Sequence, residues 1–358
     1  MSTAYLLLEN GQIFCGKYFG RENAEVVGEL VFTTGMTGYL KTLTDPSYFG
    51  QIVVQTFPLI GNYGVIPSDF ESKLIGPSAY IVKEWCHEPS NFRCEGDLDA
   101  FLKSKNITGV YGIDTRALTK VIRQNGVMNG KIMSTLSDES LEEIKKYKIQ
   151  NALNNVSTKE KYVVQPAEKK YIVALLDFGC KANIISCLVD RDCEVVVYPH
   201  DASPEEILSS KPDGILLSNG PADPSENVDV IENVKKLLKL NIPIFGICLG
   251  HQIMALAHGF KTHKMKYGHR GANQPVKENA TGNVYITSQN HGYAVTTESI
   301  NPDIADAFFT NVNDGTNEGI TYKSRPFFSV QFHPEACSGP HDAEFLFDKF
   351  IEEINNSL

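Results

Sequence analysis

The sequence predicts an α/β protein of two domains: a smaller mixed α+β N-terminal domain, and a C-terminal doubly wound, mostly parallel sheet with helices on both faces. The chain has 358 residues, which is more than one domain of ordinary size. Beyond residue 170, apolar runs alternate with amphipathic stretches, as in a parallel sheet covered by helices. The predicted strands of this sheet are residues 171–176, 194–198, 214–217 and 242–247.

The N-terminal part contains shorter elements. Its β-like runs, broken by Gly, Pro, Thr and Asp, are residues 5–8, 51–55 and 79–83. Residues 115–124 (TRALTKVIRQ) have apolar side chains at helical spacing, and Asp114 can cap this helix. We assign residues 1–150 to the N-terminal domain.

The connection between the domains is polar. Residues 139–167 carry many charged side chains with weak periodicity, and Gln165 followed by Pro166 marks a break. We expect a helix followed by a linker over residues 151–169, so that the C-terminal domain covers residues 170–358.

The clearest helix of the C-terminal domain is expected at residues 225–240. Its predicted apolar face consists of Val228, Ile231, Val234, Leu237 and Leu238. In a doubly wound sheet, ligands bind beyond the carboxyl ends of the strands. The residues that follow the predicted strands are therefore the candidates for chemistry.

Composition argues against several classes of function. The formal net charge is -10 and Lys and Arg form no cluster, which disfavours nucleic-acid binding. The N-terminal residues lack a basic leader and a long apolar core, because Glu9 interrupts them, so we expect no signal peptide. The longest apolar run, residues 171–176, is too short to span a bilayer. We expect a soluble cytoplasmic protein.

The eight cysteines would then lie in a reducing compartment, where disulfides are rare. None of them forms a CxxC pair, and the spacing of Cys180, Cys187 and Cys193 fits no zinc pattern. We therefore predict no metal site. Neither a Walker loop nor a GxGxxG motif is present, which argues against nucleotide binding by this chain.

Three segments with polar and reactive residues follow predicted strands of the C-terminal domain. They are residues 217–224 (LSNGPADP), 245–252 (FGICLGHQ) and 329–335 (SVQFHPE). In the second, Cys248 stands between Gly246 and Gly250 where a strand meets a helix, as a nucleophile does on a sharp strand-to-helix turn. The helix N-terminus would lower the pKa of the thiol. The alternative is that Cys248 is an inert, buried small side chain.

The third segment favours a catalytic role for Cys248. His333 and Glu335 are two residues apart on an extended stretch, so their side chains leave the same face. Pro334 between them favours an extended conformation at His333. A carboxylate beside an imidazole can orient it and stabilise its cation, as the third member of a triad does. A satisfied core or surface histidine is the alternative.

Acyl transfer also needs N–H donors for the oxyanion. Leu249, which follows Cys248 at the helix start, and Gly220, in the tight turn of the first segment, are the candidates for backbone donation. A turn that merely reverses the chain is the alternative for Gly220.

These three segments together resemble the triad-type (class I) glutamine amidotransferase domain, over roughly residues 170–358. Further segments resemble the small subunit of carbamoyl phosphate synthetase, and this resemblance covers nearly the whole chain. They are residues 29–48 (ELVFTTGMTGYLKTLTDPSY), 61–65 (GNYGV), 112–118 (GIDTRAL), 177–184 (DFGCKANI), 265–273 (MKYGHRGAN) and 288–293 (SQNHGY).

The resemblance implies a reaction and a partner. Glutamine would be hydrolysed to glutamate and ammonia, through a glutamyl thioester on Cys248 with His333 and Glu335 completing the triad. Ammonia would pass through an internal channel to a large synthetase subunit, giving carbamoyl phosphate for arginine and pyrimidines. No cofactor is expected on this chain, whereas ATP, Mg and bicarbonate are expected on the large subunit.

The resemblance also implies contacts with L-glutamine. The implied residues are Gly35, Gly220, Ala222, Leu249, Gln252, Asn290, Gly292 and Tyr293, and His251 is expected to be structural. The sequence departs from many relatives at three of these positions, where they have Ser for Gly35, Gly for Ala222 and Phe for Tyr293. Ala222 therefore needs a φ that a Cβ tolerates.

Two other classes of function compete with this one. Another triad-type amidotransferase or a γ-glutamyl hydrolase would use the same triad, but neither explains the N-terminal domain. A catalytically silent scaffold subunit is the second, and the intact triad argues against it.

Overall fold

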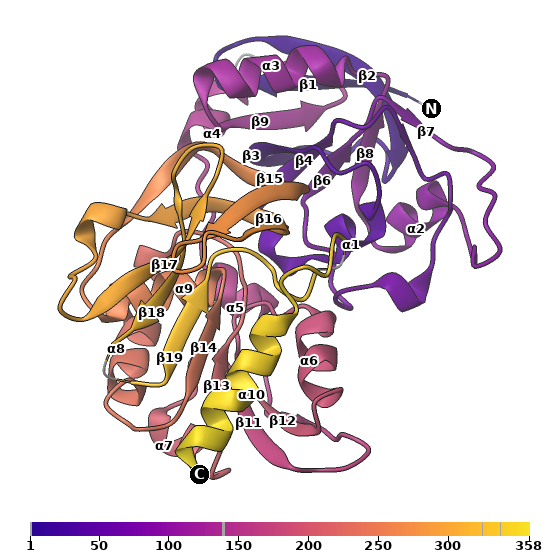
Figure 1. Cartoon of the computed structure of the whole chain (residues 1–358). Coiled ribbons are helices and arrows are strands. Elements are labelled where there is room, and N and C mark those ends of the chain that lie inside the picture. The colour runs from indigo at the N-terminus through magenta and orange to yellow at the C-terminus, as the bar shows by residue number, and fades with distance from the viewer. Residues whose placement is uncertain (1, 138–139, 324, 337) are drawn as a thin grey trace. The chain divides into compact units, whose positions relative to one another are not determined.

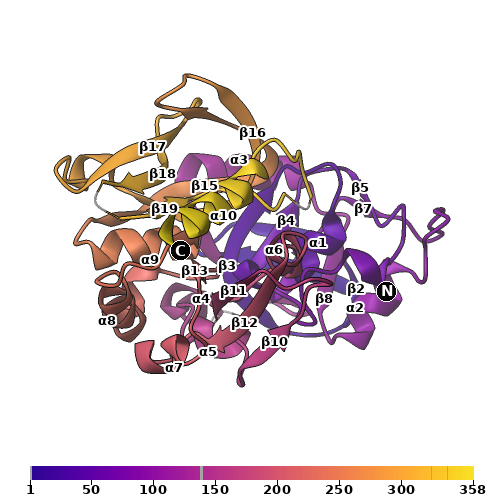
Figure 2. The ribbon, with the colours of Figure 1, turned by 60° about the horizontal axis from the view of Figure 1, so that its bottom comes forward.

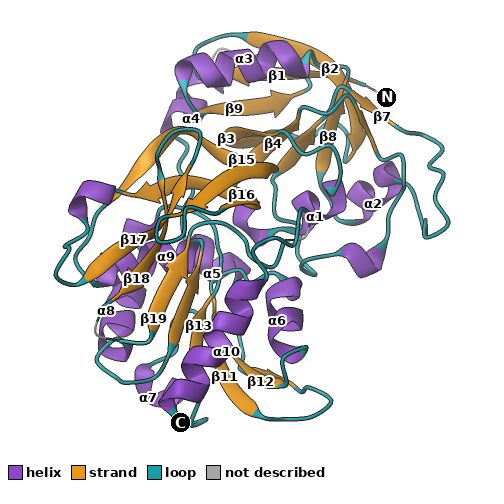
Figure 3. Ribbon diagram, viewed as in Figure 1, coloured by secondary structure: helices purple, strands orange, loops and turns teal. Residues whose placement is uncertain are grey.

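The computed structural model describes residues 2–137, 140–323, 325–336 and 338–358. The chain divides into two compact units, Met1–Ala152 and Leu153–Leu358 (Figures 1 and 3). Among the described residues, none of the helices combines the length and the apolar character that a bilayer crossing requires.

The first unit is built on a closed barrel in the order β1-β2-β8-β6-β4-β3-β9. Strands β3, β4, β6 and β8 pair in parallel, and the other pairs are antiparallel. The barrel strands are β1 (Thr3–Leu8), β2 (Ile13–Gly20), β3 (Val26–Thr33), β4 (Gln51–Gln55), β6 (Ala79–Ile81), β8 (Thr108–Tyr111) and β9 (Met128–Met133).

Short helices and one small strand pair complete the first unit. They are α1 (Tyr39–Thr44), α2 (Leu98–Ser104), α3 (Thr115–Asn125), α4 (Ser140–Lys146), the 3-10 turns η1 (Pro46–Tyr48) and η2 (Pro67–Asp69), and β5 (Leu59–Ile60) with β7 (Glu84–Trp85). Helix α3 confirms the helix expected at residues 115–124. Asp114 caps it, because its carboxylate accepts from Ala117 N at 2.9 Å.

The second unit contains a ten-stranded sheet in the order β10-β12-β11-β13-β14-β19-β18-β17-β15-β16. The five strands from β12 to β19 are parallel. The strands are β10 (Tyr162–Val164), β11 (Tyr171–Asp177), β12 (Cys193–Pro199), β13 (Gly214–Leu217), β14 (Ile244–Ile247), β15 (Thr262–Glu278), β16 (Val284–Val295), β17 (Ala305–Asn311), β18 (Asn317–Tyr322) and β19 (Phe327–Val330).

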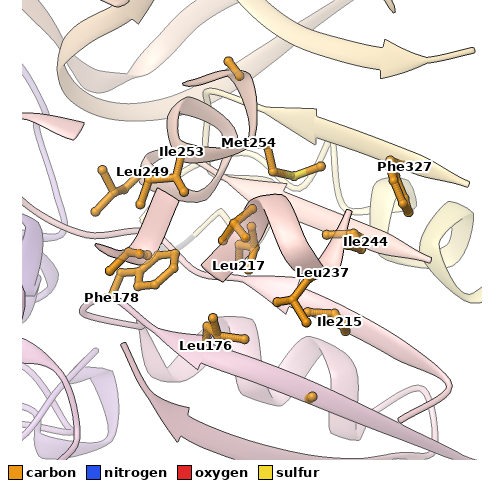
Figure 4. Close-up of a cluster of buried hydrophobic side chains, with 14 of the residues drawn as sticks. Leu176, Phe178, Ile215, Leu217, Leu237, Ile244, Leu249, Ile253, Met254 and Phe327 are labelled. Carbon is orange, nitrogen blue, oxygen red and sulfur yellow. The ribbon is translucent and has the colours of Figure 1, made fainter. Parts of the chain in front are cut away.

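Helices cover both faces of the parallel part (Figures 1 and 2). Alternate residues of its strands enter two buried clusters, one with α7, α8 and α9 and the other with α6 and α10. Figure 4 shows part of the first cluster, in which Leu217 of β13 and Leu249 of α9 lie. The helices are α5 (Ala152–Val156), α6 (Ala182–Val189), α7 (Pro204–Leu208), α8 (Val228–Leu237), α9 (Leu249–Ala257) and α10 (Phe345–Ser357), with 3-10 turns η3 (Pro224–Glu226) and η4 (Thr297–Ser299).

The predicted fold class is confirmed, and the structure adds detail that the pattern did not give. An antiparallel extension of β18, β17, β15 and β16 continues the parallel sheet. Residues of the expected linker form α5 and β10, and β10 pairs with β12. The helix expected from residue 225 begins at Val228, since Asp223 caps a separate 3-10 turn there.

One part of the predicted apolar face of α8 is wrong. Val228 is 60% exposed, whereas Val230, Val234 and Leu237 are buried. The buried side chains of α8 therefore begin at Val230, two residues later than the pattern predicted.

Candidate active site

Cys248 lies at the junction of β14 and α9 in a strained conformation, with φ 53° and ψ −102°. Such backbone values cost a non-glycine residue about 1–3 kcal/mol and cluster at functional sites. The flanking glycines permit the tight junction. An added Cβ at Gly250 would overlap the carbonyl oxygen of Leu217, and one at Gly246 would lie 2.6 Å from Met254 Sδ. The Cys248 N–H is held by Val330 O at 2.8 Å.

His333 and Glu335 form a buried pair just after β19. His333 Nδ1 donates to Glu335 Oε1 at 2.7 Å, and both residues are at most 2% exposed. The backbone N–H of His333 donates to Ser288 O at 2.9 Å, which ties the segment to β16. The structure therefore places both predicted triad partners in the geometry that an oriented imidazole requires.

The charges of this pair stabilise each other. Burial disfavours the imidazolium, but the Glu335 carboxylate raises the pKa of His333 to about 9. Burial likewise disfavours the carboxylate, but His333 and Lys181 lower the pKa of Glu335 to about 2. The pair is thus an ion pair at neutral pH, apart from proton exchange with the thiol.

The thiol of Cys248 lies within reach of this pair. Interaction with Cys248 contributes to the raised pKa of His333. Within the described residues, His333 Nε2 has no partner that meets hydrogen-bond geometry. The ring nitrogen opposite Glu335 is therefore the group available to exchange a proton with Cys248.

Lys181 is a residue of the site that the sequence reasoning missed. Its Nζ lies 3.2 Å from Glu335 Oε1, and its side chain is 5% exposed. The Lys181 N–H donates to Asn219 Oδ1 at 3.1 Å, beside the turn that contains Gly220. A lysine inside an apolar strand-to-helix segment was the available signal, because a buried lysine needs a nearby anion.

The two predicted oxyanion residues are neighbours. A Cβ added at Gly220 would lie 2.8 Å from Leu249 Cδ2 and would overlap Phe178 O, so only glycine fits. Leu249 is the first residue of α9, where a backbone N–H has no acceptor within the helix. Ala222, in the same turn as Gly220, has φ 74° and is therefore strained by its Cβ.

Most of the expected glutamine contacts of the second unit lie on α9 and β16. Cys248 Sγ lies 3.8 Å from Asn290 O, and Gln252 Nε2 donates to Tyr293 O at 2.8 Å. Gly292 lies between Asn290 and Tyr293 in β16. Strand β16 thus places these residues beside the start of α9.

Gly35 and His251 stand apart from that group. Gly35 belongs to the first unit, between β3 and α1, where its carbonyl oxygen accepts from Gln55 Nε2, so its contact with glutamine stays a prediction. His251 is fully buried, its Nδ1 is 2.8 Å from Ser329 Oγ, and burial lowers its pKa to about 3. That environment suits a neutral structural histidine.

Three residues could in principle hold a metal ion, since ligand atoms of His269, His291 and Glu318 all lie within 4.8 Å of one another. Their hydrogen bonds indicate another role. His269 bridges Asp314 Oδ2 at 2.8 Å and Glu318 Oε1 at 3.3 Å. Burial opposes its charge, but these carboxylates raise the pKa of His269. Burial raises the pKa of Glu318 as well, and His269 is the basic side chain that contacts this buried carboxyl group.

Comparison with known families agrees with both units. Residues 6–132 match the family "Carbamoyl-phosphate synthase small chain, CPSase domain", and residues 174–353 match "Glutamine amidotransferase class-I". These two ranges lie within the first and second compact units, respectively.

Similar proteins match along their whole length. The chain is 50% identical over 353 residues to "Carbamoyl phosphate synthase small chain" of Clostridium perfringens, covering 98% of this chain and 99% of that one. It is 48% identical to the protein of the same name in Fusobacterium nucleatum, with full coverage of both. It is 49% identical to "Carbamoyl phosphate synthase pyrimidine-specific small chain" of Halalkalibacterium halodurans, covering 98% and 97%. Since both units match and the relatives align over the whole chain, the chain belongs to the carbamoyl phosphate synthase small chain family.

Proposed function

We propose that this chain hydrolyses L-glutamine at Cys248 and delivers the ammonia to a large synthetase subunit that makes carbamoyl phosphate. The observation that carries the proposal is the arrangement of three side chains. Cys248 lies on a strained junction within reach of His333, and His333 is held by Glu335 at 2.7 Å. This arrangement suits acyl transfer from an amide.

The proposed reaction begins from a Cys248 thiolate paired with the His333 imidazolium, whose Nε2 carries the proton that the thiol has given up. The thiolate attacks the side-chain amide carbon of glutamine, and the N–H groups of Gly220 and Leu249 stabilise the oxyanion. His333 then protonates the departing nitrogen, so that ammonia leaves and a glutamyl thioester remains. Water, deprotonated by His333, hydrolyses the thioester and releases glutamate.

The substrate contacts follow from the same proposal. We expect Gln252 on α9, and Asn290, Gly292 and Tyr293 on β16, to bind the amino acid together with Ala222. Gly35 would add a contact from the first unit.

The partner is part of the proposal. ATP, Mg and bicarbonate would be bound by the large subunit, and this chain would need no cofactor of its own. Carbamoyl phosphate would then supply arginine and pyrimidine synthesis in the cytoplasm. The match of the first unit to the small-chain family supports a dedicated partner, because that domain goes beyond what glutamine hydrolysis requires.

The test separates the two nitrogen sources. A complex of the large subunit with the Cys248→Ala chain should make no carbamoyl phosphate from glutamine, but should make it from ammonium chloride at the wild-type rate. That rescue should improve as pH rises, because NH₃ is the reactive species. A silent scaffold would leave the wild-type complex without synthesis from glutamine, and a γ-glutamyl hydrolase would form no complex with the large subunit. Failure of the wild-type complex with both nitrogen sources would overturn the synthetase assignment.

A further inference from the structure

We propose that Gln331 is a positioning residue, which fixes the side-chain amide of Gln252 with its oxygen directed at the substrate. This inference rests on the proposed function, in which Gln252 contacts L-glutamine. Gln331 directly follows β19, and its side chain is fully buried. Its backbone N–H donates to Glu318 O at 2.9 Å, so its own position is fixed by β18.

The end of β19 and the residues that follow it contact α9 through polar side chains. Residues 329, 331 and 333 are spaced by two, so they leave one face of the extended chain. Ser329 Oγ lies 2.8 Å from His251 Nδ1, and Gln331 Oε1 accepts from Gln252 Nε2 at 2.9 Å. His251 and Gln252 are consecutive in the first turn of α9, and of these two contacts only the one from Gln331 reaches a proposed glutamine-binding residue.

The hydrogen bonds of Gln252 determine which way its amide points. Its Nε2 also lies 2.8 Å from Tyr293 O, and a backbone carbonyl can only accept. The group that faces Tyr293 is therefore the NH₂, which settles the choice between nitrogen and oxygen. Both hydrogens of this NH₂ are then used, one by Tyr293 O and one by Gln331 Oε1.

The oxygen of Gln252 is consequently turned away from both partners. It can accept an N–H bond from the substrate, and glutamine offers such donors in its side-chain amide and its α-ammonium group. The glutamate product has lost the amide donor. Gln331 thus acts on the substrate only through the orientation of Gln252.

A packing role alone does not account for a glutamine at position 331. Its Nε2 is buried and has no hydrogen-bond partner within the described residues. A buried unsatisfied donor costs about 1–3 kcal/mol, which an apolar side chain of similar shape would avoid. The oxygen end of Gln331 is the part that makes a contact, and that contact is with Gln252.

The test uses the complex with the large subunit and measures glutamine hydrolysis. Gln331→Met should raise KM for glutamine about three- to tenfold, the range for one lost hydrogen bond, and should change kcat by less than about threefold. Gln331→Glu keeps the acceptor oxygen and should return KM to within about twofold of wild type. Ser329→Ala is the matched control, because it removes the neighbouring bond to His251. It should lower the melting temperature and leave KM unchanged.

A double mutant tests whether Gln331 affects KM through Gln252. Gln331→Met combined with Gln252→Leu should have the KM of Gln252→Leu alone, since the orienting bond has nothing left to orient. Additive effects, or an unchanged KM in Gln331→Met, would overturn the positioning role while wild-type hydrolysis leaves the proposed function intact. A wild-type complex that hydrolyses no glutamine would instead overturn the proposed function, and the positioning role with it.

Discussion

Lys181 Nζ lies 3.2 Å from Glu335 Oε1, the same oxygen that accepts from His333 Nδ1 at 2.7 Å. One carboxylate oxygen therefore contacts both the Lys181 ammonium and the His333 ring, and all three side chains are almost completely buried. The Lys181 ammonium lowers the pKa of both Glu335 and His333. It thus favours the ionised carboxylate and limits how tightly the imidazole holds its proton.

Replacing Lys181 by Met should raise the pKa of His333, because the opposing positive charge is lost while Glu335 remains. The imidazolium would then release its proton to the leaving nitrogen less readily. We expect the alkaline limb of the kcat/KM profile for glutamine to move to higher pH. Lys181→Arg keeps the charge and should keep the wild-type limb. An unmoved limb in Lys181→Met would show that the ammonium does not act on His333.

Removing the nucleophile and removing the orienting carboxylate should have different consequences for glutamine hydrolysis. Cys248→Ala should lose about a millionfold in kcat, the scale found for a missing nucleophile. Glu335→Gln should lose less, up to about 10⁴, because the imidazole remains but is poorly oriented. The measurement is ammonia release by the complex. The triad assignment is wrong if both variants keep more than about a tenth of wild-type turnover.

The buried ion pair also predicts how stability depends on pH. The pKa of Glu335 is lowered from 4.5 to about 2, so its contribution is present above pH 4.5 and is lost as pH falls toward 2. The pKa of His333 is raised from 6.5 to about 9, so its contribution is present below pH 6.5 and is lost as pH rises toward 9. Urea midpoints measured across both windows should vary less in Glu335→Gln than in wild type. If the urea midpoints of Glu335→Gln and of the wild type change equally with pH, the predicted contribution of the ion pair is contradicted.

The φ of 74° at Ala222 predicts a stabilising substitution. Ala222→Gly should raise the free energy of unfolding by about 0.5–1 kcal/mol, because the relief of left-handed strain exceeds the entropy gained by the unfolded chain. Ala255→Gly, in the buried interior of α9, is the opposite control and should destabilise by at least about 1 kcal/mol. Thermal unfolding of the two variants measures the change in stability that each substitution causes. Destabilisation by Ala222→Gly would mean that the Ala222 methyl makes favourable contacts that outweigh the strain.

The network around His269 should behave as a buried ion pair. His269→Leu leaves Glu318 buried without its cation and should destabilise by about 3–5 kcal/mol. The double variant His269→Leu with Glu318→Leu should be less destabilised than His269→Leu alone, because it removes both charges. Denaturant unfolding with and without added EDTA gives the measurement. A fall in wild-type stability on chelation would instead identify His269, His291 and Glu318 as metal ligands.

The sequence predicted those features that depend on local pattern. The parallel strands were recognisable because buried runs are short and almost wholly apolar. Cys248, His333 and Glu335 were recognisable because each follows such a run and stands in a segment with special spacing. The antiparallel strands β15 and β16 were not predicted, since polar residues such as His269 and Asn290 lie within them and break the alternation that indicates a strand.

Other features depend on three-dimensional contacts and could not be derived from spacing. Lys181 and Glu335 are 154 positions apart in the sequence, and the residues near Lys181 do not indicate which side chain it contacts. Gln331 lies within the third segment, residues 329–335, but its proposed role depends on a hydrogen bond to Gln252. The sequence indicated that Ala222 needs a φ that a Cβ tolerates, but it did not give the value. That value depends on the turn, in which Gly220 packs against Phe178 and Leu249.

The closed barrel of the first unit limits how another chain can bind to it. Every strand of the barrel has a neighbour on both sides, so the barrel has no free edge strand for an incoming strand to extend. The two-residue strands β5 and β7 pair with each other, outside the barrel. We therefore expect a partner to bind the barrel mainly through side chains of its helices and loops. Strand addition, by contrast, remains open at β10, an outer strand of the larger sheet, whereas at the other outer strand, β16, Ser288 O already accepts from His333 N.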